Sequence, residues 1–239
     1  MFSLITRLYR RYHSRNTHFL DYNENSYGRE ARITNASYRK DLTSWQVPSI
    51  KQHLGSLEGK IFIDIGAGDI VLGDKLGEIG HPKKFFVLDL SEPSINAGLK
   101  RMNKNGVDTT NIIPLISYNF NFDKVDDASI DFAFSNSLFS HLSLNSIILC
   151  LRNLRPKMKV NAKYLTSMIV VPGEIEPLSY DWSYKKTPGS NIISYPTKDP
   201  YHYTKATINE TLGSRIGFKI IQIHDYGHPF QKLVEFVAV

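Results

Sequence analysis

The sequence predicts a doubly wound α/β fold, with a mostly parallel seven-stranded sheet, helices on both faces and an antiparallel C-terminal hairpin. Three observations support this prediction. Apolar, strand-length segments alternate with helices of roughly 10–15 residues, a glycine-rich turn follows the first strand, and the chain ends on two strands joined by a short Gly/Pro turn. Alternating strands and helices form right-handed βαβ units, which build a parallel sheet covered on both faces.

The expected elements run from residue 36 to the C-terminus. Strands are expected at 60–65, 84–88, 111–117, 130–135, 162–171, 218–224 and 232–239. Helices are expected at 69–79, 93–102, 144–154 and 204–216, and at 36–55 with an interruption near Pro48. Residues 172–203 are rich in Pro, Ser, Tyr and Gly and hold no clear helix, which is typical of a lid or substrate loop.

The bulk composition limits the classes of protein that fit. A chain of 239 residues suits one sizeable core, and we expect residues 1–54 to form a basic, helical lead-in and residues 55–239 the main domain. No apolar run approaches the ~18 residues of a membrane-spanning helix. The single cysteine, Cys150, excludes an internal disulfide framework and favours a reducing, cytoplasmic location.

The formal net charge of +6 is spread along the chain, which favours a generally basic surface over a nucleic-acid interface. Residues 1–20 differ, because four arginines lie opposite an apolar stripe at helical spacing. We interpret them as a basic first helix. A membrane-surface helix and an organelle-targeting leader remain alternatives.

The clearest motif is Ile-Phe-Ile-Asp-Ile-Gly-Ala-Gly-Asp at 61–69, an apolar strand that runs into Asp64, Gly66 and Gly68. Glycines allow a sharp turn and let backbone N–H groups approach a ligand. The next strand ends on Asp89, 21 residues after Gly68. An acid at this spacing is positioned to bind the hydroxyls of a ribose.

Two cofactor classes fit this pattern. A dinucleotide fingerprint needs a third glycine, where this chain has Val71, so the sequence argues against NAD. A cofactor without phosphates tolerates that substitution.

These segments resemble the D-x-G-x-G motif and the ribose-binding acid of class I S-adenosylmethionine-dependent methyltransferases. Residues 129–142 are similar to the fourth strand of that family and the turn after it, and 151–159 to the turn before its fifth strand. The chain departs from the family at Ile70, Lys157 and Lys159, which stand where glycines are frequent. The resemblance covers about residues 55–239 and implies S-adenosyl-L-methionine as the cofactor. Its implied binding residues are Asp64, Gly66, Ala67, Gly68, Asp89, Leu90, Asn119, Phe120 and Asn136.

Three histidines are candidates for a general base, because histidine titrates near neutral pH. His141 follows the fourth strand, His202 lies in the long loop, and His228 lies in the last turn. Loops after parallel strands open on the ligand-binding edge of the sheet, so we expect all three to face one cleft. We rank His228 and His141 above His202, and expect His81 on the opposite edge.

The expected function is methyl transfer to a small-molecule acceptor, most plausibly at oxygen. No D/N-P-P-Y segment follows the fourth strand, and Cys150 lacks the proline of a nucleophilic cysteine, so the two main DNA-methylation chemistries are disfavoured. No HxxxH or CxxC spacing predicts a metal site. Two alternatives remain: an RNA or protein methyltransferase of the same fold, and a non-enzymatic assembly factor that retains it.

Overall fold

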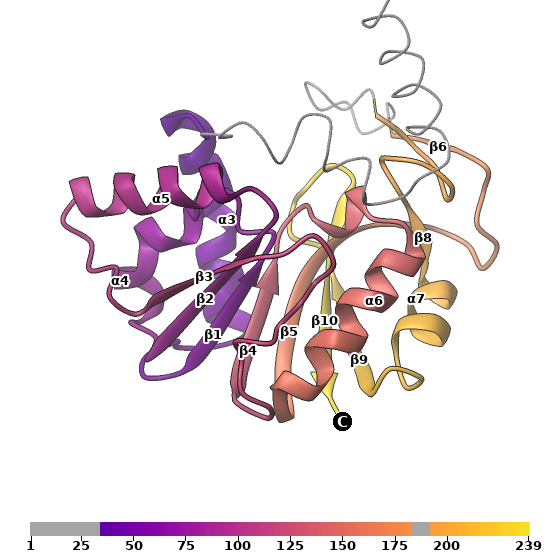
Figure 1. Cartoon of the computed structure of the whole chain (residues 1–239). Helices are drawn as coiled ribbons and strands as arrows, with labels where there is room; N and C mark the ends of the chain where they lie inside the picture. Colours follow the sequence, from indigo (N-terminus) through magenta and orange to yellow (C-terminus); the bar gives the residue numbers. More distant parts are fainter. Residues whose placement is uncertain (1–33, 183–191) are drawn as a thin grey trace, which may run out of the picture.

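The computed structural model describes residues 34–182 and 192–239 (Figure 1). The expected basic helix within residues 1–20 lies outside the described residues. Residues 183–191 of the expected lid also lie outside them.

A twisted sheet with the strand order β3-β2-β1-β4-β5-β10-β9 forms the centre of the fold. Neighbouring strands from β3 to β5 pair in parallel, whereas β10 is antiparallel to both β5 and β9. The order reverses beside β1, where a doubly wound sheet opens for ligands. The predicted fold class is confirmed. The strands are β1 Ile61–Ile65, β2 Lys84–Asp89, β3 Ile112–Ile116, β4 Ile130–Ser135, β5 Met158–Val171, β9 Phe218–His224 and β10 Gln231–Ala238.

Helices cover both faces of the sheet (Figure 1). On one face α3 (Ala36–His53), α4 (Leu76–Ile79) and α5 (Glu92–Lys104) pack against alternate strand residues such as Phe62 and Leu165. On the other face α6 (Leu144–Leu154) and α7 (Lys205–Leu212) pack against the intervening residues, including Ile63 and Tyr164. Successive strand residues point to opposite faces, so the apolar strands supply two cores.

Two helices differ from their prediction. The expected interruption at Pro48 is wrong, because α3 continues through it. Buried Val47 and Ile50 flank this proline and hold the helix against the sheet, which offsets the lost backbone hydrogen bond. The expected helix at 69–79 is a 3-10 turn, η2 (Val71–Lys75), followed by the short α4. Ile70 has a left-handed φ of 54°, so a regular helix cannot start before Val71.

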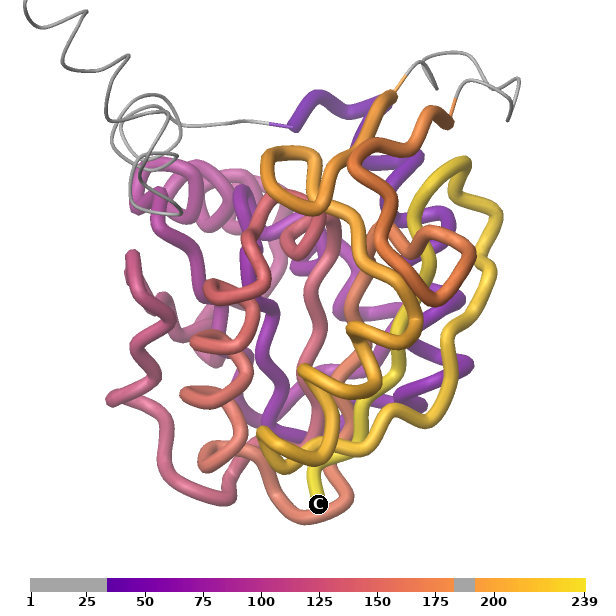
Figure 2. Tube along the Cα trace, turned by 90° about the vertical axis from the view of Figure 1, so that its right-hand side faces the viewer, coloured from indigo at the N-terminus to yellow at the C-terminus, as the bar shows by residue number. Residues whose placement is uncertain are grey.

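The segment after β5 lies over the carboxyl end of the sheet (Figure 2). Its described part forms a small ribbon of β6 (Tyr180–Asp181) and β7 (Ile193–Ser194), and β8 (Tyr203–Thr204) adds in parallel to the end of β5. No helix interrupts the described part of 172–203, as expected.

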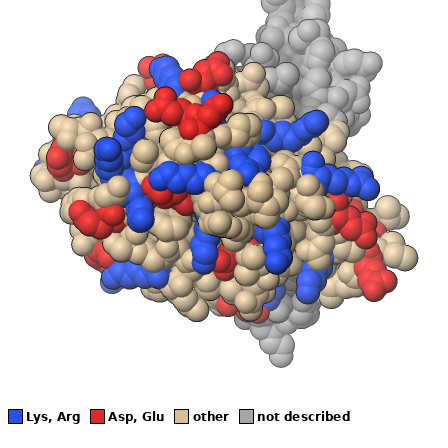
Figure 3. Space-filling view, turned by 90° about the horizontal axis from the view of Figure 1, so that it is seen from below, with Lys and Arg blue, Asp and Glu red and all other residues tan. Residues whose placement is uncertain are grey.

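The face seen in Figure 3 carries Lys and Arg side chains interspersed with Asp and Glu. This mixture agrees with a generally basic composition without a single block of positive charge on that face. Among residues 34–182 and 192–239, no helix combines the length and apolar character needed to cross a bilayer.

A buried ion-pair network fixes the turn after β1. Asp69 is 2% exposed and lies 2.7 Å from the guanidinium of Arg101 on α5, which also pairs with Asp74 at 3.0 Å. Arg101 donates a further hydrogen bond to the Asp69 carbonyl, and Thr34 donates two to the Asp69 carboxylate. The network therefore joins α5, the turn and the segment before α3.

We expect Arg101→Met to lower the free energy of unfolding by about 3 kcal/mol, because Asp69 would stay buried without its main cation. Urea denaturation measures the change. The matched control is Lys75→Met, which removes an exposed pair with Glu78 and should cost less than about 0.5 kcal/mol. Equal losses in the two variants would contradict the role assigned to Arg101.

Candidate functional site

The turn that follows β1 is fastened to the end of β2. The amides of Gly66 and Ala67 donate to the carbonyl of Leu88 at 2.7 and 3.1 Å, and the amide of Gly68 donates to the Asp89 carboxylate at 2.8 Å. Gly66 and Gly68 have φ values of 76° and 53°, which glycine adopts without steric cost. The predicted glycine turn and the acid at the end of β2 are thus in direct contact.

A cavity of about 180 Å³ lies beside this turn, at the carboxyl edge of β1 and β4. Asp64 contributes its carboxylate from β1, and Asn136 closes the cavity from the end of β4. Gln46 of α3 is buried, and its Oε1 atom has no hydrogen-bond partner among the described residues. The complete lining is Thr34, Tyr38, Leu42, Gln46, Asp64, Gly66, Ala67, Gly68, Asp69, Val71, Leu72, Phe134, Asn136 and Ser137.

Two acids give this site its electrostatic character. Burial raises the pKa of Asp64 to about 8, and the neighbouring Asp89 carboxylate adds to the increase. Burial also raises the pKa of Asp89, although hydrogen bonds from the amides of Ser91 and Gly68 oppose that increase. Within the described part of the chain, no basic side chain pairs with either carboxylate. The site therefore favours a positively charged ligand.

The remaining predicted cofactor residues occupy different positions. The Oδ1 of Asn136 accepts from the Ser167 hydroxyl at 3.2 Å, which orients its amide at the cavity. Asp89 and Leu90 are both partly exposed at the end of β2, and neither is part of the lining. Asn119 is exposed in the loop after β3, whereas Phe120 is 2% exposed and packs into the α6 core. The structure therefore brings Asn136 to the cavity and leaves Asn119 and Phe120 outside its lining.

His228 stabilises the turn between β9 and β10. Its Nδ1 accepts hydrogen bonds from the amides of Phe230 and Gln231, at 3.3 and 3.0 Å. This arrangement places the ring proton on Nε2, and burial lowers the pKa of His228 to about 4. Since its accepting nitrogen is already used, the geometry favours a structural role.

His202 is fully buried in the segment after β5. Its Nδ1 lies 2.8 Å from the Ser194 hydroxyl, and its Nε2 lies 3.0 Å from the carbonyl of Pro177. Both ring nitrogens therefore tie the strands of this segment together. His202 does not face the same cavity as Asp64.

His141 pairs with a carboxylate and lines neither the cavity at Asp64 nor the larger cavity at the ends of β5 and β9. It lies in η3 (Phe139–His141), just after the cavity residue Ser137, and its Nδ1 is 2.8 Å from Oδ1 of Asp199. Both side chains are 38% exposed. A carboxylate at Nδ1 favours the tautomer with the ring proton on that nitrogen.

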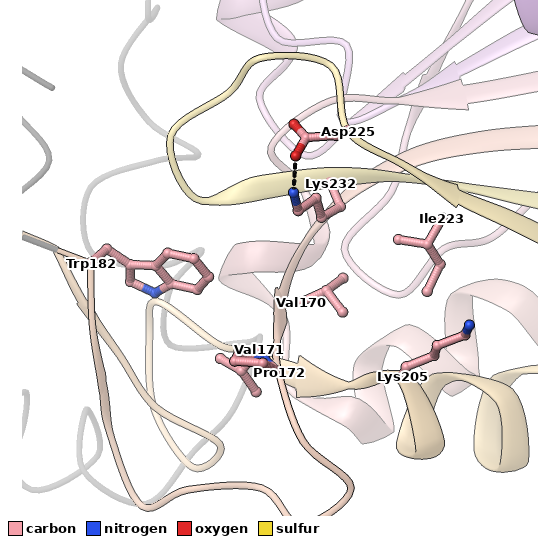
Figure 4. Close-up of a pocket in the computed structure, with 8 residues that line it drawn as sticks. All are labelled: Val170, Val171, Pro172, Trp182, Lys205, Ile223, Asp225 and Lys232. Carbon is pink, nitrogen blue, oxygen red and sulfur yellow. Dashed lines mark hydrogen bonds and ion pairs between the residues drawn. The ribbon is translucent and has the colours of Figure 1, made fainter. Parts of the chain in front are cut away.

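A second cavity, of about 440 Å³, lies at the carboxyl ends of β5 and β9 (Figure 4). Apolar walls come from Val170, Ile223 and Trp182, and Lys205 and Lys232 border the opening. Lys232 pairs with Asp225 on the same hairpin. Val171 and Pro172 complete the lining.

The contribution of α3, and of Thr34 just before it, to the first cavity is not apparent from the sequence. Thr34, Tyr38, Leu42 and Gln46 line the first cavity, although residues 1–54 are expected to form only a lead-in. A buried glutamine among apolar helix residues was the available signal, but its meaning depends on the docking of α3 against β1.

Comparisons with known proteins identify the fold. No family model and no curated protein matches the sequence. The solved structures that match include a SAM-dependent methyltransferase from Aquifex aeolicus, with 19% identity over 87% of this chain and 100% of that one, at a TM-score of 0.59. Magnesium protoporphyrin IX methyltransferase (ChlM) from Synechocystis PCC 6803, solved with bound SAH, matches with 15% identity over 98% of this chain and 100% of its own, at 0.60.

A third match is the [4+2]-cyclase SpnF, with 14% identity over 84% of this chain and 64% of that one, at a TM-score of 0.55. At these identities the comparisons establish the fold. The chain has the fold of class I S-adenosylmethionine-dependent methyltransferases, as the motif resemblance implies. The cyclase shows that this fold also supports another reaction.

The raised pKa of Asp64 predicts a specific pH dependence of stability. The value of about 8 in the folded state lies above 3.8, the ordinary value, so the folded chain binds more protons between these limits. Stability due to Asp64 is therefore greatest at low pH and declines as the pH rises toward 8. We expect Asp64→Asn to gain up to about 1.4 kcal/mol per pH unit relative to the parent chain across this interval. Urea denaturation at several pH values measures it, and parallel curves for the two proteins would contradict it.

Proposed function

We propose that this chain is an enzyme that transfers a methyl group from S-adenosyl-L-methionine to an oxygen atom of a small-molecule acceptor. The observation that supports the proposal is the cavity beside the glycine turn, which Asp64 lines and beside which Asp89 accepts the Gly68 amide. Among the residues that the structure describes, no basic side chain pairs with either acid. The His141–Asp199 pair at the same edge of the sheet supplies the base.

The cavity fits this cofactor better than a dinucleotide. S-adenosyl-L-methionine carries a sulfonium, an ammonium and one carboxylate, so its net charge is positive, whereas a dinucleotide brings two negative phosphates. A cationic ligand stabilises the ionised forms of Asp64 and Asp89, which the phosphates of a dinucleotide would disfavour. When bound, the cofactor supplies the transferable methyl group on a sulfonium leaving group.

Particular residues suit particular parts of that ligand. Asp89, at the end of β2, is placed to accept hydrogen bonds from the ribose hydroxyls. The carboxylate of Asp64 and the unpaired Oε1 of Gln46 are acceptors for the ammonium group. Gly68 leaves space for the ligand to approach the backbone, because a Cβ there would meet no atom within 4 Å, whereas the Leu138 side chain packs against Gly66.

An oxygen acceptor agrees with the presence of a histidine–carboxylate pair. A hydroxyl must lose its proton as it attacks, whereas an amine can attack with its own lone pair. Asp199 orients His141 and stabilises the imidazolium that forms when Nε2 takes the proton. The protein otherwise acts by alignment and by exclusion of water.

The second cavity is suited to the acceptor. Its volume of about 440 Å³ lies in the usual range of small-molecule sites. Its walls are apolar, and Lys205 borders it while Lys232 is paired with Asp225, so it suits an acceptor with an apolar body and an anionic group beside Lys205.

Calorimetric titration with S-adenosyl-L-methionine tests the cofactor site. We expect 1:1 binding, weakened by at least ~1 kcal/mol in Asp89→Ala and in Gln46→Leu through lost hydrogen bonds. Asp41→Ala, on the exposed side of α3, is the matched control and should bind normally. A well-folded chain that does not bind the cofactor would instead favour the non-enzymatic alternative.

Methyl transfer itself is tested by mass spectrometry of cell-extract metabolites incubated with enzyme and cofactor, where the acceptor should gain one methylene unit. We expect His141→Ala to reduce kcat by about 100-fold or more with unchanged cofactor binding. Asp199→Asn should cause a smaller loss and shift the pH–rate profile, because it orients the base. Full activity in His141→Ala would remove this residue from the mechanism.

A further inference from the structure

Three side chains that are distant in sequence meet on the α3 face of the sheet. His53 belongs to the last turn of α3, His224 is the last residue of β9, and Glu235 lies in β10. The candidate ligand atoms all lie within 4.8 Å of one another. Spacing along the chain does not reveal this group, because the fold alone brings positions 53, 224 and 235 together.

The distances suit a common metal ion. The Nε2 of His224 is 3.1 Å from Oε2 of Glu235, and the Nδ1 of His53 is 3.7 Å from the same oxygen. Zinc binds nitrogen and carboxylate oxygen at about 2.0–2.2 Å in tetrahedral geometry, which separates neighbouring ligand atoms by roughly 3.3–3.6 Å. The two observed distances are close to this range.

Hydrogen bonding alone explains only part of the arrangement. A bond between His224 and Glu235 accounts for the 3.1 Å contact. The 3.7 Å separation from His53 is too long for a hydrogen bond, yet the two imidazole rings lie only 4.0 Å apart between centroids. A cation at the edge of the rings, bound by Nδ1 of His53, Nε2 of His224 and Oε2 of Glu235, would account for the position of His53.

A neighbouring lysine orients the Glu235 carboxylate toward the two histidines. Lys163 on β5 lies 2.8 Å from Oε1 of Glu235 and donates to the backbone carbonyl of His53, also at 2.8 Å. One carboxylate oxygen is therefore held by a neighbour while the other faces the two imidazoles. Metal-binding carboxylates are commonly oriented by such a second contact.

We propose that His53, His224 and Glu235 bind a Zn²⁺ ion that joins the end of α3 to strands β9 and β10. The side chains are only 7–16% exposed, so the ion is reached from one side and a water completes its coordination. None of the three residues lines either cavity, so the role of the ion is structural.

Zinc binding to the full chain tests the proposal without any assay of activity. The protein is first freed of metal with a chelator, then titrated with Zn²⁺ alone in a calorimeter and heated with and without the ion. We expect one site per chain with a Kd of about 1 µM or tighter and a higher Tm with zinc. Substitution with Co²⁺ should give the intense visible absorption of a tetrahedral site.

Two single variants locate the site. His53→Gln and His224→Gln should each weaken zinc binding at least about tenfold and remove the zinc-dependent rise in Tm. The matched control is His81→Gln, an exposed histidine at the amino end of β2, which should bind as the parent chain does. If one of these variants fails to fold in the presence of chelator, zinc binding by the other variant tests the site.

Two results would overturn the proposal. One is a parent chain that folds but binds no zinc, which would identify the three residues as an ion-paired cluster alone. The other is tight 1:1 binding that survives both substitutions, which would place the metal elsewhere in the chain. Neither result bears on methyl transfer, so the two proposals stand or fall separately.

Discussion

The contact between the glycine turn and the end of β2 is the constraint on which the rest of the site depends. The Asp89 carboxylate accepts the Gly68 amide on one oxygen and the Ser91 amide on the other. These two bonds hold the turn after β1 against the start of α5, and Ser91 is also the N-cap of α5. The same carboxylate thus shapes the turn and remains beside the cavity.

This arrangement has a cost in stability. Asp64 and Asp89 are close enough to raise the pKa of Asp64, and neither is neutralised by a basic side chain within the described residues. By contrast, Asp69 is compensated by Arg101. The chain therefore neutralises the acid that holds the fold together, whereas Asp64 in the cavity and Asp89 beside the glycine turn lack such a partner, as expected where binding is favoured over stability.

Local signals were sufficient for most of the fold. Strand periodicity predicts β4 and β9 with their observed bounds, and the helix expected at 93–102 is confirmed as the core of α5. The predictions are wrong where tertiary contacts determine the local backbone conformation. The left-handed Ile70 replaces a regular helix by η2, and the packing of Val47 keeps α3 continuous through Pro48.

The site divides in the same way. The turn and Asp89 follow from a local motif, whereas the partners of each histidine do not. The sequence does not distinguish the surroundings of His141 from those of His202. His141 lies beside Asp199 and His202 beside Ser194, and neither contact can be read from the sequence because loops bring the partners together. Gln46 and His53 are further examples, since each acquires its meaning from the strand against which α3 docks.

Helix α3 connects the two proposed sites. Gln46 lines the acidic cavity, and His53, about two turns further along the same helix, reaches β9 and β10. Close-packed helices move as rigid units, so fixing one end restricts the other. The Arg39 and Thr34 contacts to the Asp69 network already hold the amino end of α3 near the glycine turn. A cation at His53 would hold its carboxyl end, and the position of Gln46 in the cavity would then be set from both ends of the helix.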